Sequence, residues 1–318
     1  MTLFDVFNGD ADGLCALQQL RLVEPARSTL VTGVKRDIAL LERIDAAAGD
    51  RVTVLDLSLD KNRPALLGLL ERGVAVRYFD HHYPGEIPRH PLLDAHIDTR
   101  ADKGTSLLVD DYLDGAQRAW AVVGTFGDNF DAAARRAAEP LGLGDRDLAR
   151  LRELGILLNY NGYGATVDDL HVPPAELYRR IAPYEDPLRF VDADSTFGLL
   201  RDGYRDDMER ARSVSPETQT ERYALIVLPA QAWARRVGGV YANELAGAAP
   251  GRAHAMLTRL PDGGFVVSVR APVANAEGAD ALCRRFEGGG GRKAAAGINR
   301  LPESDLDRFV AAFVAAFG

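Results

Sequence analysis

Hydrophobic and polar positions alternate in blocks along the first hundred residues. Short apolar runs rich in β-branched residues predict strands, at residues 2–7, 29–34, 52–57 and 74–79. The stretches between them, such as residues 39–47 and 64–72, have the apolar spacing that predicts helices. Strands that alternate with helices indicate an α/β domain, built on a parallel sheet with helices on both faces.

The pattern changes twice further along the chain. Helices dominate from about residue 103 to 180, and a charged stretch without strand signals follows. The run YALIVLP then predicts a strand, and HAMLTRLPDGGFVVSVR predicts a β-hairpin with its turn at PDGG. The pattern predicts a domain over residues 1–185, a connector over 186–221, and a smaller C-terminal α/β domain over 222–318 that closes on an amphipathic helix.

Composition narrows the class of protein. A chain of 318 residues favours two domains, and 47% apolar residues support a large core. No apolar run is long enough to span a membrane. The segment MTLFDVFNGD lacks the features of a signal peptide, and two lone cysteines indicate a reduced, cytoplasmic setting. The net charge of −8 argues against a protein that coats long duplex DNA, but allows small nucleotides or short single strands.

The polar residues that carry chemistry follow the predicted strands. They are Asn8, Asp10 and Asp12 after the first strand, Asp56 after the third, and Asp80, His81 and His82 after the fourth. The carboxyl ends of parallel strands share one edge, so these side chains are expected to meet. Crowded carboxylates repel unless a cation lies among them. Oxygen ligands with imidazoles suit Mn²⁺ or Mg²⁺, and a dense cluster suits two ions bridged by one carboxylate.

Each of these residues also has an ordinary structural interpretation. An aspartate at a strand end often caps the next helix, which applies to Asp12 and Asp56. The two histidines could be residues of a surface loop. Thr105 and Ser106 are expected to cap a helix, while His90 and His96 are expected in a loop. Three polar clusters at three strand ends nevertheless favour a metal site.

The motifs together resemble the DHH phosphoesterase superfamily. FNGDADG is similar to its first motif, VLDLS to the second, FDHHYPG to the third that names the family, and AVVGTFGDNF to the fourth. In the C-terminal part, FVVSVRAPVAN and FEGGGGRKAAAG resemble the associated substrate-binding domain. The resemblance covers nearly the whole chain and implies a metal-dependent hydrolase with a DHH domain and a smaller substrate-binding domain.

The resemblance also implies roles for individual residues. Asp10 and Asp56 would hold one metal, with Asn8 at a position where relatives have histidine or aspartate. Asp12, Asp56, His81 and Asp128 would hold the other, so that Asp56 bridges two Mn²⁺ ions, or two Mg²⁺ ions. His82 would face the scissile phosphate as hydrogen-bond donor or general acid, and Asp80 would orient the histidines.

The C-terminal motif is expected to bind phosphate. The backbone of Gly289, Gly290 and Gly291 would approach an anion, and a helix beginning at Arg292 would direct its positive end toward it. Arg292 stands where the family usually has a histidine, and an arginine can bind a phosphate with two hydrogen bonds. Arg270 is the other predicted phosphate ligand.

The expected function is hydrolysis of phosphodiester or phosphomonoester bonds in short single-stranded nucleic acid or small nucleotides, with no membrane or long duplex as partner. A homodimer is compatible with the sequence. Two alternatives stay open. Asn8 could mark an impaired metal site in a nucleotide-binding regulator, and a pyrophosphatase or polyphosphatase would share the metal motifs. The glycine signature argues against the second.

Overall fold

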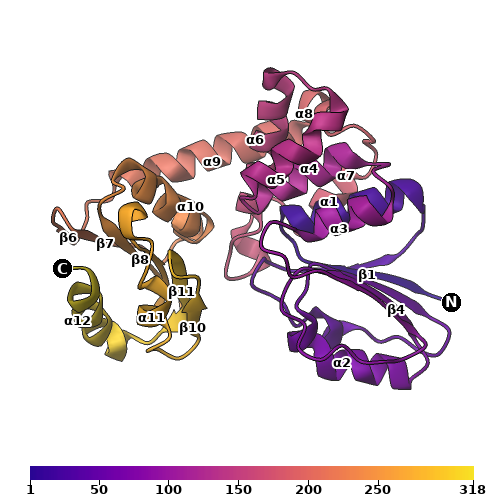
Figure 1. The fold of residues 1–318 in the computed structure, drawn as a ribbon, viewed down its shortest axis with the longest axis horizontal. Coiled ribbons are helices and arrows are strands. Elements are labelled where there is room, and N and C mark those ends of the chain that lie inside the picture. Colours follow the sequence, from indigo (N-terminus) through magenta and orange to yellow (C-terminus); the bar gives the residue numbers. More distant parts are fainter. The chain divides into compact units, whose positions relative to one another are not determined.

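The computed structural model describes residues 1–318. The chain divides into two units, Met1–Asp202 and Gly203–Gly318, and Figure 1 shows a separate sheet in each. The boundary falls inside helix α9 (Ser195–Ser213), within the stretch predicted to connect two domains. Both units combine strands and helices, so the predicted α/β class is confirmed.

The first unit is built on a five-stranded parallel sheet with the order β2-β1-β3-β4-β5. The strands are β1 (Leu3–Phe7), β2 (Thr29–Val31), β3 (Arg51–Leu55), β4 (Ala75–Asp80) and β5 (Leu93–Ile97). The four predicted strands are present. The pattern does not predict the fifth, because its residues, LDAHI, mix polar and apolar types.

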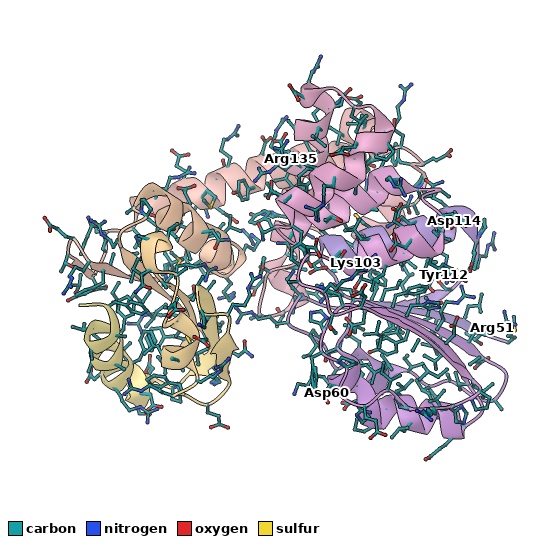
Figure 2. The ribbon with its side chains drawn as sticks, viewed as in Figure 1. Arg51, Asp60, Lys103, Tyr112, Asp114 and Arg135 are labelled. Carbon is teal, nitrogen blue, oxygen red and sulfur yellow. The ribbon has the colours of Figure 1, made fainter.

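The loop position expected for His96 is wrong, because this residue lies on β5. Its ring stacks on Phe79 with 4.6 Å between centroids, and Tyr112 packs edge-on against the same Phe79 ring at 5.1 Å. Tyr112, labelled in Figure 2, is the last residue of α3 (Thr105–Tyr112), the helix that comes after β5 in the chain. An edge strand can carry polar residues on its solvent side, so its sequence gives a weak signal.

Helices cover both faces of this sheet, as predicted, with α2 on one side and α1 and α3 on the other (Figure 1). The helices of the first unit are α1 (Ala11–Val23), α2 (Leu59–Glu71), α3 (Thr105–Tyr112), α4 (Arg118–Gly127), α5 (Asp131–Ala138), α6 (Asp145–Asn161), α7 (Pro174–Ile181) and α8 (Pro187–Ala193), with 3₁₀ turns η1 (Leu40–Arg43), η2 (Glu139–Leu141) and η3 (Val167–Asp169).

The helix predicted over residues 39–47 is wrong, since only the 3₁₀ turn η1 forms there. The buried side chain of Asn62 accounts for the difference. It accepts a hydrogen bond from the Leu41 amide at 3.2 Å and donates one to the Ile38 carbonyl at 2.7 Å. These backbone groups therefore find partners without a full helix.

The second unit contains a six-stranded sheet with the order β10-β11-β9-β8-β7-β6. Only β7 and β8 pair in parallel. The strands are β6 (Thr218–Gln219), β7 (Tyr223–Leu228), β8 (Ala253–Arg259), β9 (Phe265–Arg270), β10 (Gly289–Gly291) and β11 (Ala295–Leu301), and the helices are α10 (Ala232–Ala248), α11 (Ala279–Cys283) and α12 (Leu306–Phe317), with turns η4 (Val273–Asn275) and η5 (Glu303–Asp305). The predicted β8–β9 hairpin is present.

The helix expected to begin at Arg292 is wrong. The glycine run forms strand β10, which pairs antiparallel with β11, and Arg292 and Ala295 exchange backbone hydrogen bonds of 2.9 and 3.1 Å across the turn. Gly291, with φ 137°, adopts a conformation that favours glycine. The three consecutive alanines at 294–296 favour a helix by local propensity. The small residues of β10 and β11 nevertheless let the two strands pair as a hairpin.

Apolar side chains of both units are buried in separate cores, and both cysteines are buried as well. None of the helices combines the length and apolar character needed to cross a membrane.

Two glycines let the loops that follow β1 and β2 come close together. A Cβ on Gly9 would lie 2.0 Å from the Gly33 carbonyl oxygen and 2.7 Å from Pro174 Cγ. Gly9→Ala is therefore expected to lower the free energy of unfolding by about 2–3 kcal/mol, because backbone must move to admit the methyl group. Chemical denaturation measures this change.

Gly198→Ala is the matched control. Gly198 lies in α9 with open space around its missing Cβ, so alanine is expected to raise stability by about 0.5–1 kcal/mol. Equal effects at the two positions would contradict the close approach of the β1 and β2 loops.

Candidate metal centre

Four predicted ligands meet at the carboxyl edge of the parallel sheet. Asp56 follows β3, His81 follows β4, Asp12 lies in the first turn of α1, and Asp128 ends α4. We refer to these residues as the four-ligand cluster. His81 Nε2 lies 3.4 Å from Asp56 Oδ1, 3.6 Å from Asp128 Oδ2 and 3.9 Å from Asp12 Oδ2. Three carboxylate oxygens therefore lie around the His81 nitrogen, in two overlapping sets of possible metal ligands that share His81.

Helix N-termini orient two of the aspartates. Asp10 Oδ1 accepts hydrogen bonds of 3.1 Å from the amides of Asp12 and Gly13 and so caps α1. The Asp12 carboxylate accepts from the amides of Thr105 at 2.6 Å and Ser106 at 2.8 Å, at the start of α3. Contrary to expectation, Thr105 and Ser106 do not cap α3 with their side chains. Asp12 supplies the cap from another helix, since the residue before α3 is Gly104.

Asp56 has an unusual backbone. Its φ is 59°, in the left-handed region that few residues other than glycine adopt. The side chain is buried and accepts a hydrogen bond of 3.1 Å from Thr105 Oγ1. A strained, buried aspartate whose carboxylate faces other acids is typical of a functional site.

His82 and Asp80 form a separate pair. His82 Nδ1 lies 2.7 Å from Asp80 Oδ1, and nearly half of the His82 side chain is exposed, whereas Asp80 is buried. This contact orients the ring and uses Nδ1, so that Nε2 is the other ring nitrogen that could contact a ligand. His82 also lies near Asp56, with 4.0 Å between His82 Nδ1 and Asp56 Oδ1.

The predicted ligands Asn8 and Asp10 are not part of the four-ligand cluster. The remaining oxygen of Asp10, Oδ2, contacts the Lys35 ammonium. The same ammonium lies 3.1 Å from Asp128 Oδ1 and 2.9 Å from Asn159 Oδ1. Asn8 Nδ2 donates to the Lys35 carbonyl at 3.3 Å, and its buried Oδ1 has no hydrogen-bond partner.

Sequence reasoning missed Lys35. The available signal was its position shortly after β2, because β2 is the parallel neighbour of β1 and ends at the same edge of the sheet. A lysine in the loop that follows β2 therefore reaches the acids that follow β1.

Burial and crowding shift the pKa values of the ligands. Burial, followed by repulsion from Asp128 and Asp10, raises the pKa of Asp12 to about 6. Burial and repulsion from Asp10 and Asp12 raise the pKa of Asp56 well above its usual range. Burial alone would lower the pKa of His81, but the surrounding carboxylates raise it to about 10. The centre therefore holds more negative charge than its own side chains neutralise.

The predicted phosphate ligands lie in the second unit. Arg270 ends β9, and its Nε donates to Asn243 Oδ1 at 2.6 Å. Arg292 is exposed at the β10–β11 turn, beside the strand formed by Gly289, Gly290 and Gly291.

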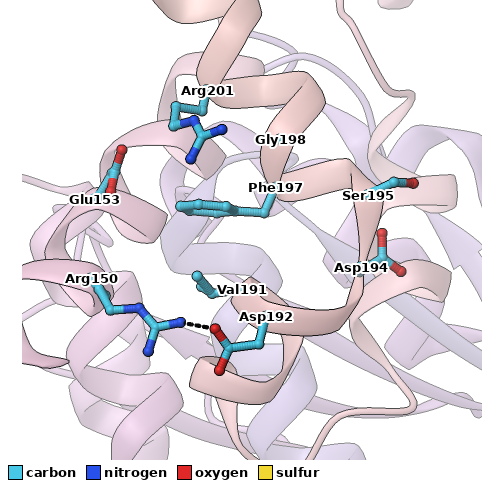
Figure 3. Close-up of a pocket in the computed structure, with 9 residues that line it drawn as sticks. All are labelled: Arg150, Glu153, Val191, Asp192, Asp194, Ser195, Phe197, Gly198 and Arg201. Atoms are coloured by element: carbon cyan, nitrogen blue, oxygen red, sulfur yellow. Dashed lines mark hydrogen bonds and ion pairs between the residues drawn. The ribbon is translucent and has the colours of Figure 1, made fainter.

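A hollow of about 400 Å³ elsewhere in the first unit contains none of these residues (Figure 3). It lies between α6, α8 and α9. An ion pair between Arg150 and Asp192 spans part of it, and Arg201 lies 5.7 Å from the centre of the Phe197 ring. None of the groups that could hold a metal ion lies in this hollow.

No protein-family model and no curated protein matches the chain. Solved structures do. RecJ of Thermus thermophilus in complex with Mn²⁺ is 20% identical with a TM-score of 0.67, and the match covers 99% of this chain and 51% of that one. The DHH domain of a protein described as a member of a ribosomal protein family is 13% identical with a TM-score of 0.68, and the match covers 99% of this chain and 86% of that one. A pGpG-specific phosphodiesterase of Vibrio cholerae is 13% identical with a TM-score of 0.55, and the match covers 99% of this chain and 98% of that one.

These likenesses define the class of fold. The chain has the fold of the DHH phosphoesterases over nearly its whole length, as its motifs predicted. It spans about half of the Thermus RecJ chain.

The pKa of His81 makes metal binding depend on pH. To become a ligand, His81 must release the proton that it holds below about pH 10. The apparent affinity for a divalent ion is therefore expected to rise about tenfold per pH unit between pH 6 and 8. Without metal, the raised pKa values of His81 and Asp12 stabilise the fold at low pH, and this contribution is lost as the pH rises through about 6 and then toward 10.

The difference in Tm between Mn²⁺-saturated and metal-free protein should accordingly widen from pH 6 to pH 8. Differential scanning fluorimetry measures it. His81→Gln should show a smaller difference that widens less with pH, because only the aspartates of the cluster still have protons to release. A wild-type difference independent of pH would contradict His81 as a ligand.

Proposed function

We propose that this protein is a metal-dependent phosphoesterase that hydrolyses short single-stranded nucleic acid or small nucleotides. The observation that carries the proposal is the four-ligand cluster, in which three carboxylates lie around His81, with an adjacent, partly exposed histidine held by a carboxylate. Similarity of fold to RecJ and to the pGpG-specific phosphodiesterase supports the same reaction class.

The donor set fits a divalent cation such as Mn²⁺ or Mg²⁺. Asp12, His81 and Asp128 offer ligand atoms within 4.8 Å of one another, as do Asp56, His81 and His82. Three oxygens and one imidazole suit a hard or borderline ion. A bound divalent ion would lower the pKa of a water molecule and withdraw charge from the phosphoryl group.

The chain's own residues would supply the other parts of the reaction. His82, with its Nδ1 against Asp80, would donate a proton from Nε2 to the leaving oxygen. Burial alone would lower the pKa of His82, but the hydrogen bond to Asp80 and the attraction of Asp56 raise it, which keeps the proton available near neutral pH. Asp80 would act as a positioning residue, because it holds the ring and does not reach the substrate.

Charge supports a small substrate. The chain carries a formal charge of −8, which disfavours long polyanions. Arg270 and Arg292 are suited to binding a phosphate. A terminal or bridging phosphate of a short chain is the substrate feature that these groups would recognise.

A hydrolysis panel tests the proposal. It would contain RNA and DNA from dimers to about twenty-mers, cyclic dinucleotides, a bisphosphorylated nucleoside and pyrophosphate, each with Mn²⁺. We expect cleavage of one class of short substrate, abolished by EDTA and restored by Mn²⁺. A loss of at least about 10³-fold in kcat is expected for Asp56→Asn.

Asparagine is the matched substitution at Asp56. It tolerates the left-handed backbone and can still accept from Thr105 Oγ1, so it removes charge without adding strain. Absence of hydrolysis across the panel by folded, Mn²⁺-loaded protein would contradict the proposal. Cleavage of pyrophosphate alone would replace the substrate class with that of a pyrophosphatase.

The phosphate ligand in the second unit has its own test. Arg292→Ala is expected to raise KM about tenfold or more and to change kcat little, because a remote phosphate contact contributes to binding. Steady-state kinetics separates the two constants. Arg300→Ala, which removes an arginine paired with Asp262 in the same unit, should leave both unchanged. An unchanged KM in Arg292→Ala would contradict the assignment.

A further inference from the structure

A lysine ammonium occupies part of the acidic centre. Lys35 Nζ contacts Asp10 Oδ2 and lies 3.1 Å from Asp128 Oδ1 and 2.9 Å from Asn159 Oδ1. These three oxygens come from the loop after β1, the end of α4 and helix α6. Such a set of convergent oxygens would otherwise suit a metal cation.

The Lys35 backbone is held in place from two sides. Its amide donates to the Gly162 carbonyl at 2.8 Å, and its carbonyl accepts from Asn8 Nδ2 at 3.3 Å. The ammonium also lies 5.6 Å from the centre of the Tyr163 ring, within the range of a cation–π interaction. The residue is therefore part of the site and not a surface side chain that has turned inward.

The ligands around Lys35 leave little for a second ion. Asp10 caps α1 through Oδ1 and contacts Lys35 through Oδ2, so an ion at Oδ2 would compete with the ammonium, whereas the oxygens of Asp12 accept from neutral amides. Asn8 is neutral, its amide nitrogen is committed to Lys35, and only its Oδ1 remains. A metal ion bound to Asp10 would have to displace the Lys35 ammonium. At position 8 it would find the neutral amide oxygen of Asn8 instead of a charged carboxylate.

The charge of the site is compatible with one divalent ion beside Lys35. Asp10, Asp12, Asp56 and Asp128 bring four negative charges when ionised. One divalent ion and Lys35 bring three positive charges, which nearly balance them. Two divalent ions and Lys35 bring five, which exceed the four negative charges by one, so the charge count alone does not distinguish one ion from two.

We propose that this centre takes one divalent ion, held by the four-ligand cluster, and that the Lys35 ammonium stands where a second ion would contact Asp10, Asp128 and Asn159. The inference rests on the proposed function and replaces the two-ion centre that the sequence motifs suggest. The chain itself thus supplies one of the two cations, at a fixed position beside the reacting phosphoryl group, where it would stabilise developing negative charge.

Counting bound metal tests the proposal directly. Wild-type protein stripped of metal, titrated with Mn²⁺ and analysed by elemental analysis and electron paramagnetic resonance, should bind one ion per chain. Its spectrum should be that of an isolated Mn²⁺ ion. Two ions per chain with a spin-coupled spectrum would overturn the proposal.

A variant designed to bind a second ion is the second test. Lys35→Met combined with Asn8→Asp removes the ammonium and adds a carboxylate, so a second ion should enter and the coupled spectrum should appear. The matched control is Lys103→Met, since Lys103 (labelled in Figure 2) is another partly buried lysine of the first unit and pairs with Asp111, which is not one of the predicted ligands. It should bind one ion. A folded double variant that still binds one ion would contradict the role of Lys35.

The metal count separates this inference from the proposed function. A wild-type chain that binds no ion would overturn both. A wild-type chain that binds two ions and hydrolyses its substrate would overturn only the role of Lys35. The wild-type measurement decides even where the double variant fails to fold.

Discussion

The central constraint on this protein is the concentration of like charge at one edge of a buried sheet. A parallel sheet directs the ends of its strands to a common edge, and here the ends of strands and helices bring Asp10, Asp12, Asp56 and Asp128 together. Burial makes each charge costly unless a partner compensates for it. The fold therefore has to supply positive charge, or bind it.

The compensation comes from several kinds of group. The amides at the start of α1 and α3 donate to Asp10 and Asp12, so the partial positive charge of two helix ends faces the acids. His81 lies among three carboxylates. The same hydrogen bonds that stabilise the helices also orient the carboxylates, which is why structural and functional interpretations of Asp12 are compatible. Preorganised ligands of this kind need little rearrangement to bind an ion.

Sequence reasoning could predict the residues that follow strong strands. Asp56 and His81 stand directly after RVTVL and AVRYFD, which have strong strand propensity, so both their position and their meeting point follow from strand direction. The edge strand that carries His96 gave no such signal, because one side of it is polar. The hairpin at Arg292 was missed because alanine favours helix locally, whereas the pairing of β10 with β11 decides the structure. Tertiary contacts outweighed local propensity in both places.

Lys35 illustrates a different limit. Nothing in the loop GVKRD marks a lysine as part of a site, and its role depends on β2 lying beside β1. Asn8, taken alone, suggests a weakened metal ligand. In the structure the two residues form one feature, because the Asn8 amide holds the Lys35 carbonyl while the Lys35 ammonium holds Asp10. In the proposed one-ion site, a carboxylate at position 8 would add a negative charge that no further cation balances. The neutral amide of Asn8 and the ammonium of Lys35 are then two parts of the same electrostatic balance.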